Sequence, residues 1–189
     1  MLDSDIKIYV LPGGRLPERQ TEGAIGYDVC LRAIVSPHKM DLSNPNLRHT
    51  LFDFRTVPND PELARHICRT DGGELVYRMD PGESVLVGIG FITEMPYPMF
   101  YWVAPRSGLS SKWGITVTNA PGTVDPDYRG EAGVLVYNRN QTTYDLRHNM
   151  RIAQIIFQLA LIPQITEVSD STGLVVTRRG AGGFGSTGV

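Results

Sequence analysis

Apolar residues in this chain gather in short runs separated by glycine, proline and polar residues. Four runs rich in Val, Ile, Phe and Tyr stand out: ESVLVGIGFITEM (83–95), MFYWVAP (99–105), GEAGVLVYN (130–138) and RIAQIIFQLALI (151–162). Such runs, bounded by turn residues, predict β-strands. The last is long enough for a buried helix, but its β-branched pairs and the proline directly after it favour a strand. The pattern predicts an all-β barrel or sandwich of jelly-roll type.

The segment from residue 37 to 81 departs from this pattern, because it is polar, weakly periodic and interrupted by prolines. Within it, NDPELARHICRT carries a helix-start signal, with Asn59 or Asp60 at the N-cap and a proline in the first turn. Leu63 and Ile67 would then share one face of a short helix. We interpret the segment as an insertion into a single domain that spans the whole chain, not as a second domain.

Composition and charge narrow the function classes. A chain of 189 residues with 41% hydrophobic and 20% charged residues is ordinary for one soluble globular domain. The formal net charge of −2 provides no basic excess for a nucleic-acid backbone. No stretch approaches the roughly 20 apolar residues that span a bilayer, and the acidic start differs from a secretory signal. With only Cys30 and Cys68 as cysteines, we expect reduced thiols and a soluble cytoplasmic protein, without nucleic-acid or membrane partners.

The stretch NAPGTVDPDYRGEAGVLVYN (119–138) carries the most informative candidate chemistry. Its proline, glycine and aspartate residues break regular structure between two apolar strands, which predicts a β-hairpin. A bend that presents Asp125 and Tyr128 beside exposed backbone could recognise a flat base by its edge. Both residues are equally ordinary in turns, so the hairpin alone leaves function and turn structure as equal alternatives.

Three further stretches hold weaker signals. APRSGLSSKWGI places Arg106, Ser107 and Gly108 directly after a strand, a combination that suits phosphate oxygens, although Ser-Gly is also a common turn. EGAIGYDVCLR puts Asp28 at the start of an apolar segment. RIAQIIF puts Gln154 among apolar neighbours, where a buried amide needs hydrogen-bond partners.

The chain ends in RGAGGFGSTG (179–188), in which glycines surround a cation, an aromatic ring and two hydroxyls. Glycine loses more backbone freedom on ordering than any other residue, so this tail should move unless something holds it. A frayed terminus is the simpler interpretation of the tail alone.

Taken in order, these five stretches resemble the five motifs of the trimeric all-β family of dUTP pyrophosphatases: AIGYDV, PRSGLSSKWGI, PGTVDPDYRGE, RIAQIIF and RGAGGFGSTG. The resemblance covers residues 21–32 and about 82–188 and omits the insertion; the third and fifth motifs are the most specific. It implies a distorted jelly-roll β-barrel. It also implies hydrolysis of dUTP to dUMP and pyrophosphate, which keeps uracil out of DNA and supplies dUMP for thymidylate synthesis.

The resemblance further implies roles for individual residues. Asp125 would be the base that activates water against the α-phosphorus. Asp28 would hold, through waters, an Mg²⁺ ion chelated by the triphosphate. The other implied substrate-binding residues are Arg106, Ser107, Gly108 and Gln154 for the phosphates, Asn119, Gly122, Thr123 and Val124 for the uracil edge, Tyr128 for the deoxyribose, and Arg179, Phe184, Gly185, Ser186 and Thr187 in a flexible C-terminal arm (178–189), with Phe184 stacked on the uracil.

In the family that this chain resembles, three chains share each site. The resemblance therefore implies a homotrimer in which one chain supplies the first, second and fourth motifs, another the hairpin, and a third the arm. An isolated subunit would then be inactive.

Two other protein classes are alternatives to a dUTP pyrophosphatase, and the role of the insertion is a separate question. A dCTP deaminase shares this fold but carries an essential glutamate where this chain has Leu135, and it lacks the glycine-rich arm. A binding or regulatory protein that had lost catalysis should have lost Asp28, Asp125 or the arm. In the insertion, a set formed by His38, His49, His66 and Cys68 lacks zinc-finger spacing. We interpret the insertion as an added surface layer suited to a protein partner.

Overall fold

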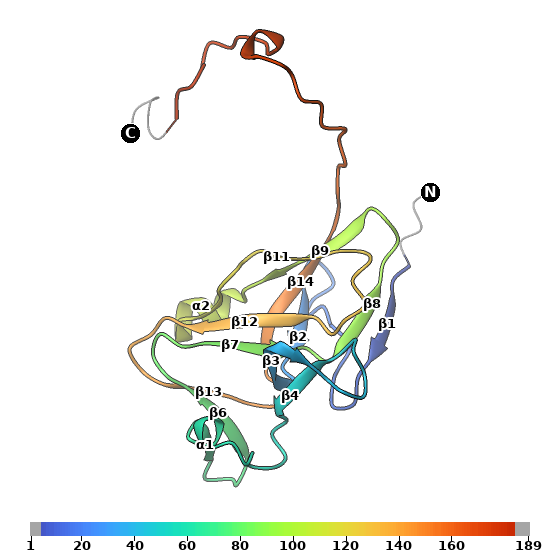
Figure 1. Ribbon diagram of the computed structural model, residues 1–189. Coiled ribbons are helices and arrows are strands. Elements are labelled where there is room, and N and C mark those ends of the chain that lie inside the picture. The colour runs from blue at the N-terminus through green and yellow to red at the C-terminus, as the bar shows by residue number, and fades with distance from the viewer. Residues whose placement is uncertain (1–4, 184–189) are drawn as a thin grey trace.

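The computed structural model of the protein describes residues 5–183 and consists mainly of antiparallel strands (Figure 1). The strands are β1 (Lys7–Val10), β2 (Tyr27–Cys30), β3 (Ala33–Met40), β4 (Arg48–Phe52), β5 (Ile67–Arg69), β6 (Leu75–Met79), β7 (Ser84–Gly88), β8 (Phe91–Glu94), β9 (Met99–Ala104), β10 (Ile115–Val117), β11 (Gly122–Val124), β12 (Gly133–Asn138), β13 (Tyr144–Leu146) and β14 (Arg151–Leu159). The helices are α1 (Pro61–Ala64), α2 (Ser107–Trp113) and the 3₁₀ turn η1 (Ser171–Gly173). The predicted all-β class is confirmed.

Two large sheets share the hydrophobic core. One has the strand order β10-β12-β7-β3-β4 and the other β11-β9-β14-β2, while β13-β6-β5 and β1-β8 form smaller sheets. In β12 alternate residues are buried, so Val134 and Val136 lie in the core opposite Val87 and Val85 of β7. This alternation is typical of a sheet with one face on the core.

The four apolar runs become strands, but one run becomes two. Residues 151–162 form the strand β14 (Arg151–Leu159), which confirms strand over helix. Residues 83–95 divide into β7 and β8 because the chain turns at Gly90, where φ is +79°. A Cβ at Gly90 would lie 2.5 Å from the Cα of Gly14, so a larger residue has no room there.

The insertion contains the expected short helix, α1, whose N-cap Asp60 accepts hydrogen bonds from the backbone N–H groups of Glu62 and Leu63. The prediction that Leu63 and Ile67 share one face of the helix was wrong. The helix ends at Ala64, and Ile67 begins β5; both side chains still pack against the core.

The sequence pattern did not predict the strands of the insertion or the helix α2. Strand β3 enters the insertion with four buried residues followed by four exposed ones, and so shows no alternation. Helix α2 contains a glycine and three serines, yet the buried Leu109 and a left-handed C-cap at Gly114 stabilise it. Within residues 5–183, no helix combines the length and apolar character needed to cross a bilayer. Cys30 and Cys68 are free thiols.

The C-terminal segment leaves the barrel after β14 and extends away from it (Figure 1). Among the described residues, its last hydrogen bond to the body joins the Ala160 N–H to the Pro98 carbonyl at 3.0 Å. Beyond that point Ile165, Val175 and Val176 are each at least 90% exposed. The segment therefore adds little to the hydrophobic core of its own chain.

A buried ion pair anchors the bend that precedes β12. Glu131 is 1% exposed and accepts two hydrogen bonds from Arg32, at 2.7 Å from Nε and 2.6 Å from Nη2. The Gly90 N–H adds a third hydrogen bond to this carboxylate at 2.9 Å. A Cβ at Gly88 would lie 2.4 Å from Glu131 Oε1, so the carboxylate fits only beside a glycine.

We predict that Glu131→Gln lowers the free energy of unfolding by about 3–5 kcal/mol, because it leaves the Arg32 guanidinium buried without a counter-charge. Urea unfolding followed by tryptophan fluorescence measures the loss. Glu94→Gln is the control, because it breaks the exposed Lys7–Glu94 pair, which should cost less than about 1 kcal/mol. Equal losses for the two variants would contradict the anchoring role.

Candidate functional site

Two groups of the sequence-predicted site residues come together in separate places. The first, which we call the Asp28 cluster, consists of the predicted residues Asp28, Arg106 and Gln154 together with Arg151, which was not predicted. Asp28, 9% exposed, accepts hydrogen bonds from Arg106 Nε at 3.0 Å and from Arg151 Nη1 at 3.2 Å. Two guanidinium groups around one carboxylate leave a net positive charge, which suits an anionic ligand.

Strand pairing explains why these motifs meet. The central strand β14 pairs with β2 on one side and β9 on the other, so Gln154 lies opposite both Asp28 and Ala104. Gln154 is half-buried, not buried, and its Nε2 donates to the Pro105 carbonyl at 3.0 Å, which gives the amide a partner. A Cβ at Gly26 would lie 2.1 Å from Gln154 Oε1, so the glycine of AIGYDV leaves room for this side chain.

Helix α2 begins directly beside the cluster. Arg106 is its N-cap residue, and Ser107 and Gly108 form its first turn. Arg106 Nη1 donates to the Arg151 carbonyl at 3.1 Å, which fixes the start of the helix to β14. Sequence analysis overlooked Arg151. Its only signal was its place as the first residue of RIAQIIF, and only the pairing of β14 with β2 shows that it reaches Asp28.

The second group lies at the bend between β11 and β12. The prediction of a β-hairpin was wrong in its pairing: β11 pairs with β9, whereas β12 pairs with β10 and β7. The two strands belong to different sheets and diverge after the bend. The Tyr128 N–H donates to the Asp125 carbonyl at 3.2 Å, so the turn itself does form.

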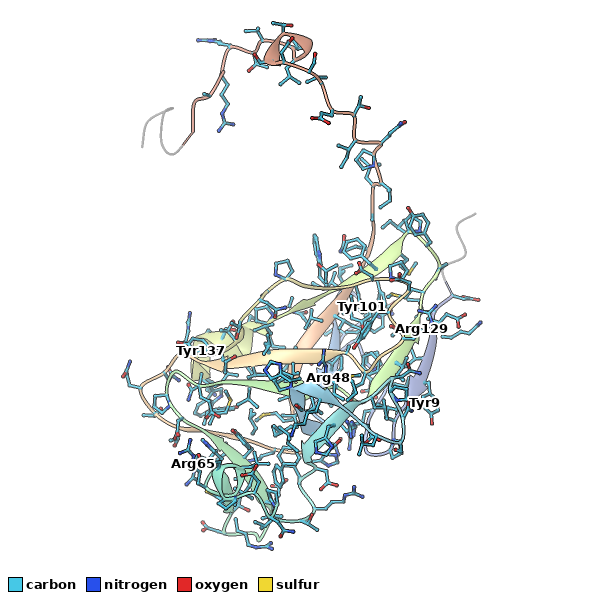
Figure 2. The ribbon with its side chains drawn as sticks, in the orientation of Figure 1. Tyr9, Arg48, Arg65, Tyr101, Arg129 and Tyr137 are labelled. Carbon is cyan, nitrogen blue, oxygen red and sulfur yellow. The ribbon has the colours of Figure 1, made fainter. Side chains whose placement is uncertain are left out.

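The divergence of the strands opens a cavity of about 230 Å³, which we call the bend pocket. It is lined by Arg48, Thr123, Val124, Asp125, Tyr128, Ala132 and Gly133. The Tyr128 hydroxyl donates to the Glu131 carbonyl at 3.1 Å across the bend, so the ring has a fixed position. The Asp125 side chain is exposed. Arg48 comes from the insertion and was not among the candidate residues (Figure 2).

Two more predicted residues lie at the base of β11. A Cβ at Gly122 would lie 3.2 Å from the Asn119 amide nitrogen, so the Asn119 side chain lies against Gly122. Gly122 comes directly before Thr123 and Val124, which line the bend pocket, and Asn119 lies just upstream in the chain. The structure thus gathers the residues of PGTVDPDYRGE and Asn119 around one bend.

The Asp28 cluster and the bend pocket lie far apart in one chain. In the order β11-β9-β14-β2, Asp125 follows one edge strand and Asp28 lies on the other. Three strand spacings separate them by about 14 Å across the sheet. The register adds an offset of four residues, roughly 13 Å along the strands, because Val124 pairs with Tyr101 whereas Gln154 pairs with Ala104. One chain therefore holds the two groups apart, and we call each of them a half-site as a name only.

The C-terminal motif is only partly described. Arg179 Nε donates to the Gly182 carbonyl at 2.8 Å within the extended segment. The predicted contacts of Phe184, Gly185, Ser186 and Thr187 lie outside the described residues.

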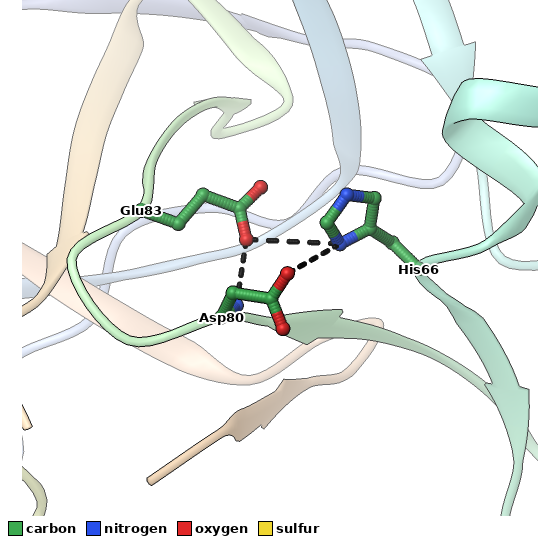
Figure 3. A group of neighbouring side chains, drawn as sticks. All are labelled: His66, Asp80 and Glu83. Atoms are coloured by element: carbon green, nitrogen blue, oxygen red, sulfur yellow. Dashed lines mark hydrogen bonds and ion pairs between the residues drawn. The ribbon is translucent and has the colours of Figure 1, made fainter. Parts of the chain in front are cut away.

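One polar cluster lies away from both half-sites (Figure 3). Of the described side chains, His66, Asp80 and Glu83 alone are grouped closely enough to hold a metal. Their atoms already have partners: His66 Nδ1 is 3.0 Å from the Arg78 carbonyl, and Glu83 accepts from the Tyr77 hydroxyl at 2.6 Å. Burial, and then this bond to Glu83, raise the pKa of Tyr77, so its hydroxyl keeps its proton. The cluster fastens the insertion to the turn before β7.

Sequence comparisons relate this chain to one group of proteins. Residues 76–188 match the sequence model of the dUTPase family. The deoxyuridine 5'-triphosphate nucleotidohydrolase of Rhizobium rhizogenes is 49% identical over 112 residues, which are 58% of this chain and 68% of the relative. The protein of the same name from Heliobacterium modesticaldum is 36% identical over 178 residues, which are 94% of this chain and 92% of the relative. This second similarity extends through most of the insertion.

Solved structures share the fold. The Staphylococcus bacteriophage 80alpha dUTPase with dUPNHPP has a TM-score of 0.68 at 18% identity, over 98% of this chain and 99% of that chain. A variant of the phage phi11 dUTPase of S. aureus, described with a structural Mg(II) ion, has a TM-score of 0.61 at 15% identity, over 88% and 97% of the two chains.

Proposed function

This chain belongs to the dUTPase family and is a dUTP diphosphatase, and on that premise we propose that it works as a homotrimer with shared sites. Each site would combine the Asp28 cluster of one chain with the bend pocket of a second and the arm of a third. The observation that carries this proposal is the strand order, which keeps the Asp28 cluster and the bend pocket at opposite edges of one sheet. The exposed apolar residues after β14 support it, because an arm of this kind needs a neighbour to cover it.

The bend pocket would hold the uracil and the deoxyribose. Its volume of about 230 Å³ lies below the roughly 300–1,000 Å³ of pockets that enclose whole drug-sized ligands, so it suits the nucleoside part and not the whole nucleoside triphosphate. Asn119 and the backbone of Gly122, Thr123 and Val124 would pair with the uracil edge. Tyr128, held by its bond to Glu131, would pack under the sugar and leave no room for a 2′-hydroxyl.

The Asp28 cluster would hold the triphosphate. Arg106 and Arg151 lie side by side there and present donors that match phosphate oxygens. Ser107, Gly108 and Gln154 complete this half-site. The net positive charge of the cluster would offset the negative charge of the substrate. The overall charge of the chain, −2, would not do so.

Mg²⁺ fits this cluster through water. Both Asp28 oxygens already accept from guanidinium groups, but a carboxylate offers about four lone-pair positions. Each oxygen therefore keeps capacity for a water molecule. Asp28 would hold, through such waters, a Mg²⁺ ion chelated by the substrate; when bound, the ion would neutralise phosphate charge and orient the chain of phosphates.

Asp125 would act as the general base. Its exposed carboxylate would take a proton from a water molecule as the water oxygen bonds to the α-phosphorus. The bond from that phosphorus to the bridging oxygen then breaks, and pyrophosphate leaves with the electron pair. Arg179, Ser186 and Thr187 of the arm would bind the outer phosphates, and Phe184 would cover the uracil. Closure of the arm would exclude bulk water, and opening would release the products.

A deaminase is disfavoured by Leu135. This residue lies in β12, opposite Leu86 of β7, and its aliphatic side chain can neither donate nor accept a proton. The only carboxylate nearby along the chain is Glu131, whose two oxygens are bonded to Arg32.

We predict that Asp125→Asn lowers kcat for dUTP by about a hundred- to ten-thousand-fold, because the amide cannot accept the proton. Binding of a non-hydrolysable imido analogue of dUTP should change little. Pyrophosphate release and calorimetry measure the two quantities. Asp127→Asn, in an exposed residue of the same bend, is the matched control and should stay near wild-type turnover. A near-normal kcat for Asp125→Asn would refute the base assignment.

Shared sites make a distinct prediction for mixed subunits. Arg106→Ala and Asp125→Asn should each be nearly inactive alone, because each damages a different half-site. Unfolded together at equal amounts and refolded, they should recover about a quarter of wild-type turnover, since every mixed trimer regains one intact site. Sites contained in one chain would give no recovery.

Removal of residues 178–189 should reduce turnover severely while the barrel remains folded, because the extended segment contributes little to the core. The assays are dUTP turnover, circular dichroism and the oligomeric state. Removal of Val189 alone, which lies beyond the fifth motif, is the control. Full activity without the arm would show that the arm does not close the site.

A further inference from the structure

Arg48 joins the insertion to the bend pocket. It is the first residue of β4, pairs with Met40 of β3, and lines the same cavity as Asp125 and Tyr128. Figure 2 shows it on the side of the barrel that β12 crosses. The motifs of the family resemblance do not include it, because it lies in the insertion.

The guanidinium of Arg48 is only partly bonded. Nη1 donates to the Pro37 carbonyl at 3.0 Å. Of residues 5–183, Arg48 Nε is the single buried side-chain nitrogen or oxygen without a hydrogen-bond partner. An arginine keeps its charge, and a buried donor without an acceptor carries an uncompensated desolvation penalty. Because protein covers Nε, an acceptor in the pocket would meet the guanidinium at Nη2, which has no hydrogen-bond partner among the described residues.

Arg48 is also held in place from both sides. The Glu131 N–H donates to the Asn46 carbonyl at 3.2 Å, which ties the loop before β4 to the residue that follows the bend. Glu131 is itself fixed by Arg32. The bond to Pro37 fixes the other end of the side chain. A donor held this firmly can select a ligand by the position of its acceptor.

We propose that Arg48 is a specificity-determining residue, whose guanidinium donates a hydrogen bond to the carbonyl oxygen at ring position four of uracil in the bend pocket. This inference rests on the proposed function, because it takes the bend pocket to be the uracil site. Uracil has a carbonyl at that position, whereas cytosine has an amino group. A guanidinium has donors only, so it bonds the carbonyl and opposes the amino group.

The charge of Arg48 could instead act on Asp125, which lines the same cavity. Among the described residues, however, the ion pairs within 4.0 Å do not include Arg48 with Asp125. A purely electrostatic role would shift the pH dependence of kcat and leave the preference for uracil over cytosine unchanged. A hydrogen bond to the nucleobase would change both KM and that preference.

The test compares Arg48→Met, Arg48→Lys and wild type with dUTP and dCTP. Arg48→Met should raise KM for dUTP about tenfold or more with kcat nearly unchanged, because binding to ground and transition states is lost equally. The ratio of kcat/KM for dUTP over dCTP should fall by a similar factor. Arg48→Lys should retain part of that ratio, because an ammonium also has donors only and favours a carbonyl over an amino group.

Arg55→Met is the matched control, since it removes an exposed arginine, paired with Asp53, from the same insertion. It should behave as wild type. Calorimetric binding of dUMP and dCMP to each folded variant gives a readout independent of turnover, and should show weaker dUMP binding only for the Arg48 variants. An unchanged ratio for Arg48→Met, equal losses for dUTP and dCTP, or the same effect from Arg55→Met would overturn the proposal. Failure of the wild-type protein to hydrolyse dUTP would overturn the proposed function instead.

Discussion

The buried ion pair between Arg32 and Glu131 is the interaction on which the bend depends. Glu131 follows the bend by a few residues, and its carboxylate is held by Arg32 and by the Gly90 N–H. Its backbone carbonyl accepts from the Tyr128 hydroxyl, and its N–H donates to Asn46 of the insertion. One residue thus fixes the wall of the pocket, the aromatic ring and the inserted loop. A buried charge tolerates this position because both carboxylate oxygens accept hydrogen bonds and the Arg32 guanidinium balances the charge.

The antiparallel register of the four-stranded sheet shapes the site in a second way. It brings the first, second and fourth motifs together at β2 and β14 and keeps the bend at the opposite edge. In the proposed assembly the two groups would complement each other: the Asp28 cluster would supply charge, and the bend pocket would supply a cavity with an exposed carboxylate. Their separation along the sheet is what leads us to propose shared sites.

Much of the fold follows from local sequence, and the remainder depends on contacts between distant residues. The apolar runs predicted β9, β12 and β14 because burial on at least one face leaves a dense β-branched pattern. Helix α2 was missed because its serines and glycine have weak helix propensity, and tertiary packing of Leu109 decides the outcome. The pairing at the bend was missed because turn residues predict a change of direction, whereas the partners of β11 and β12 lie elsewhere in the chain.

The candidate site likewise contains some residues that the sequence predicts and others that only strand pairing reveals. Asp28, Arg106, Asp125 and Gln154 lie in stretches with distinctive composition, so sequence analysis selected them. Arg151 and Arg48 are single charges in otherwise ordinary strands, and their places beside Asp28 and in the bend pocket arise only from register. The extended segment after β14 has a wider consequence. In the shared-site assembly that we propose, turnover would depend on protein concentration, so dilution alone would silence the enzyme as surely as an inhibitor, with no change to any single molecule.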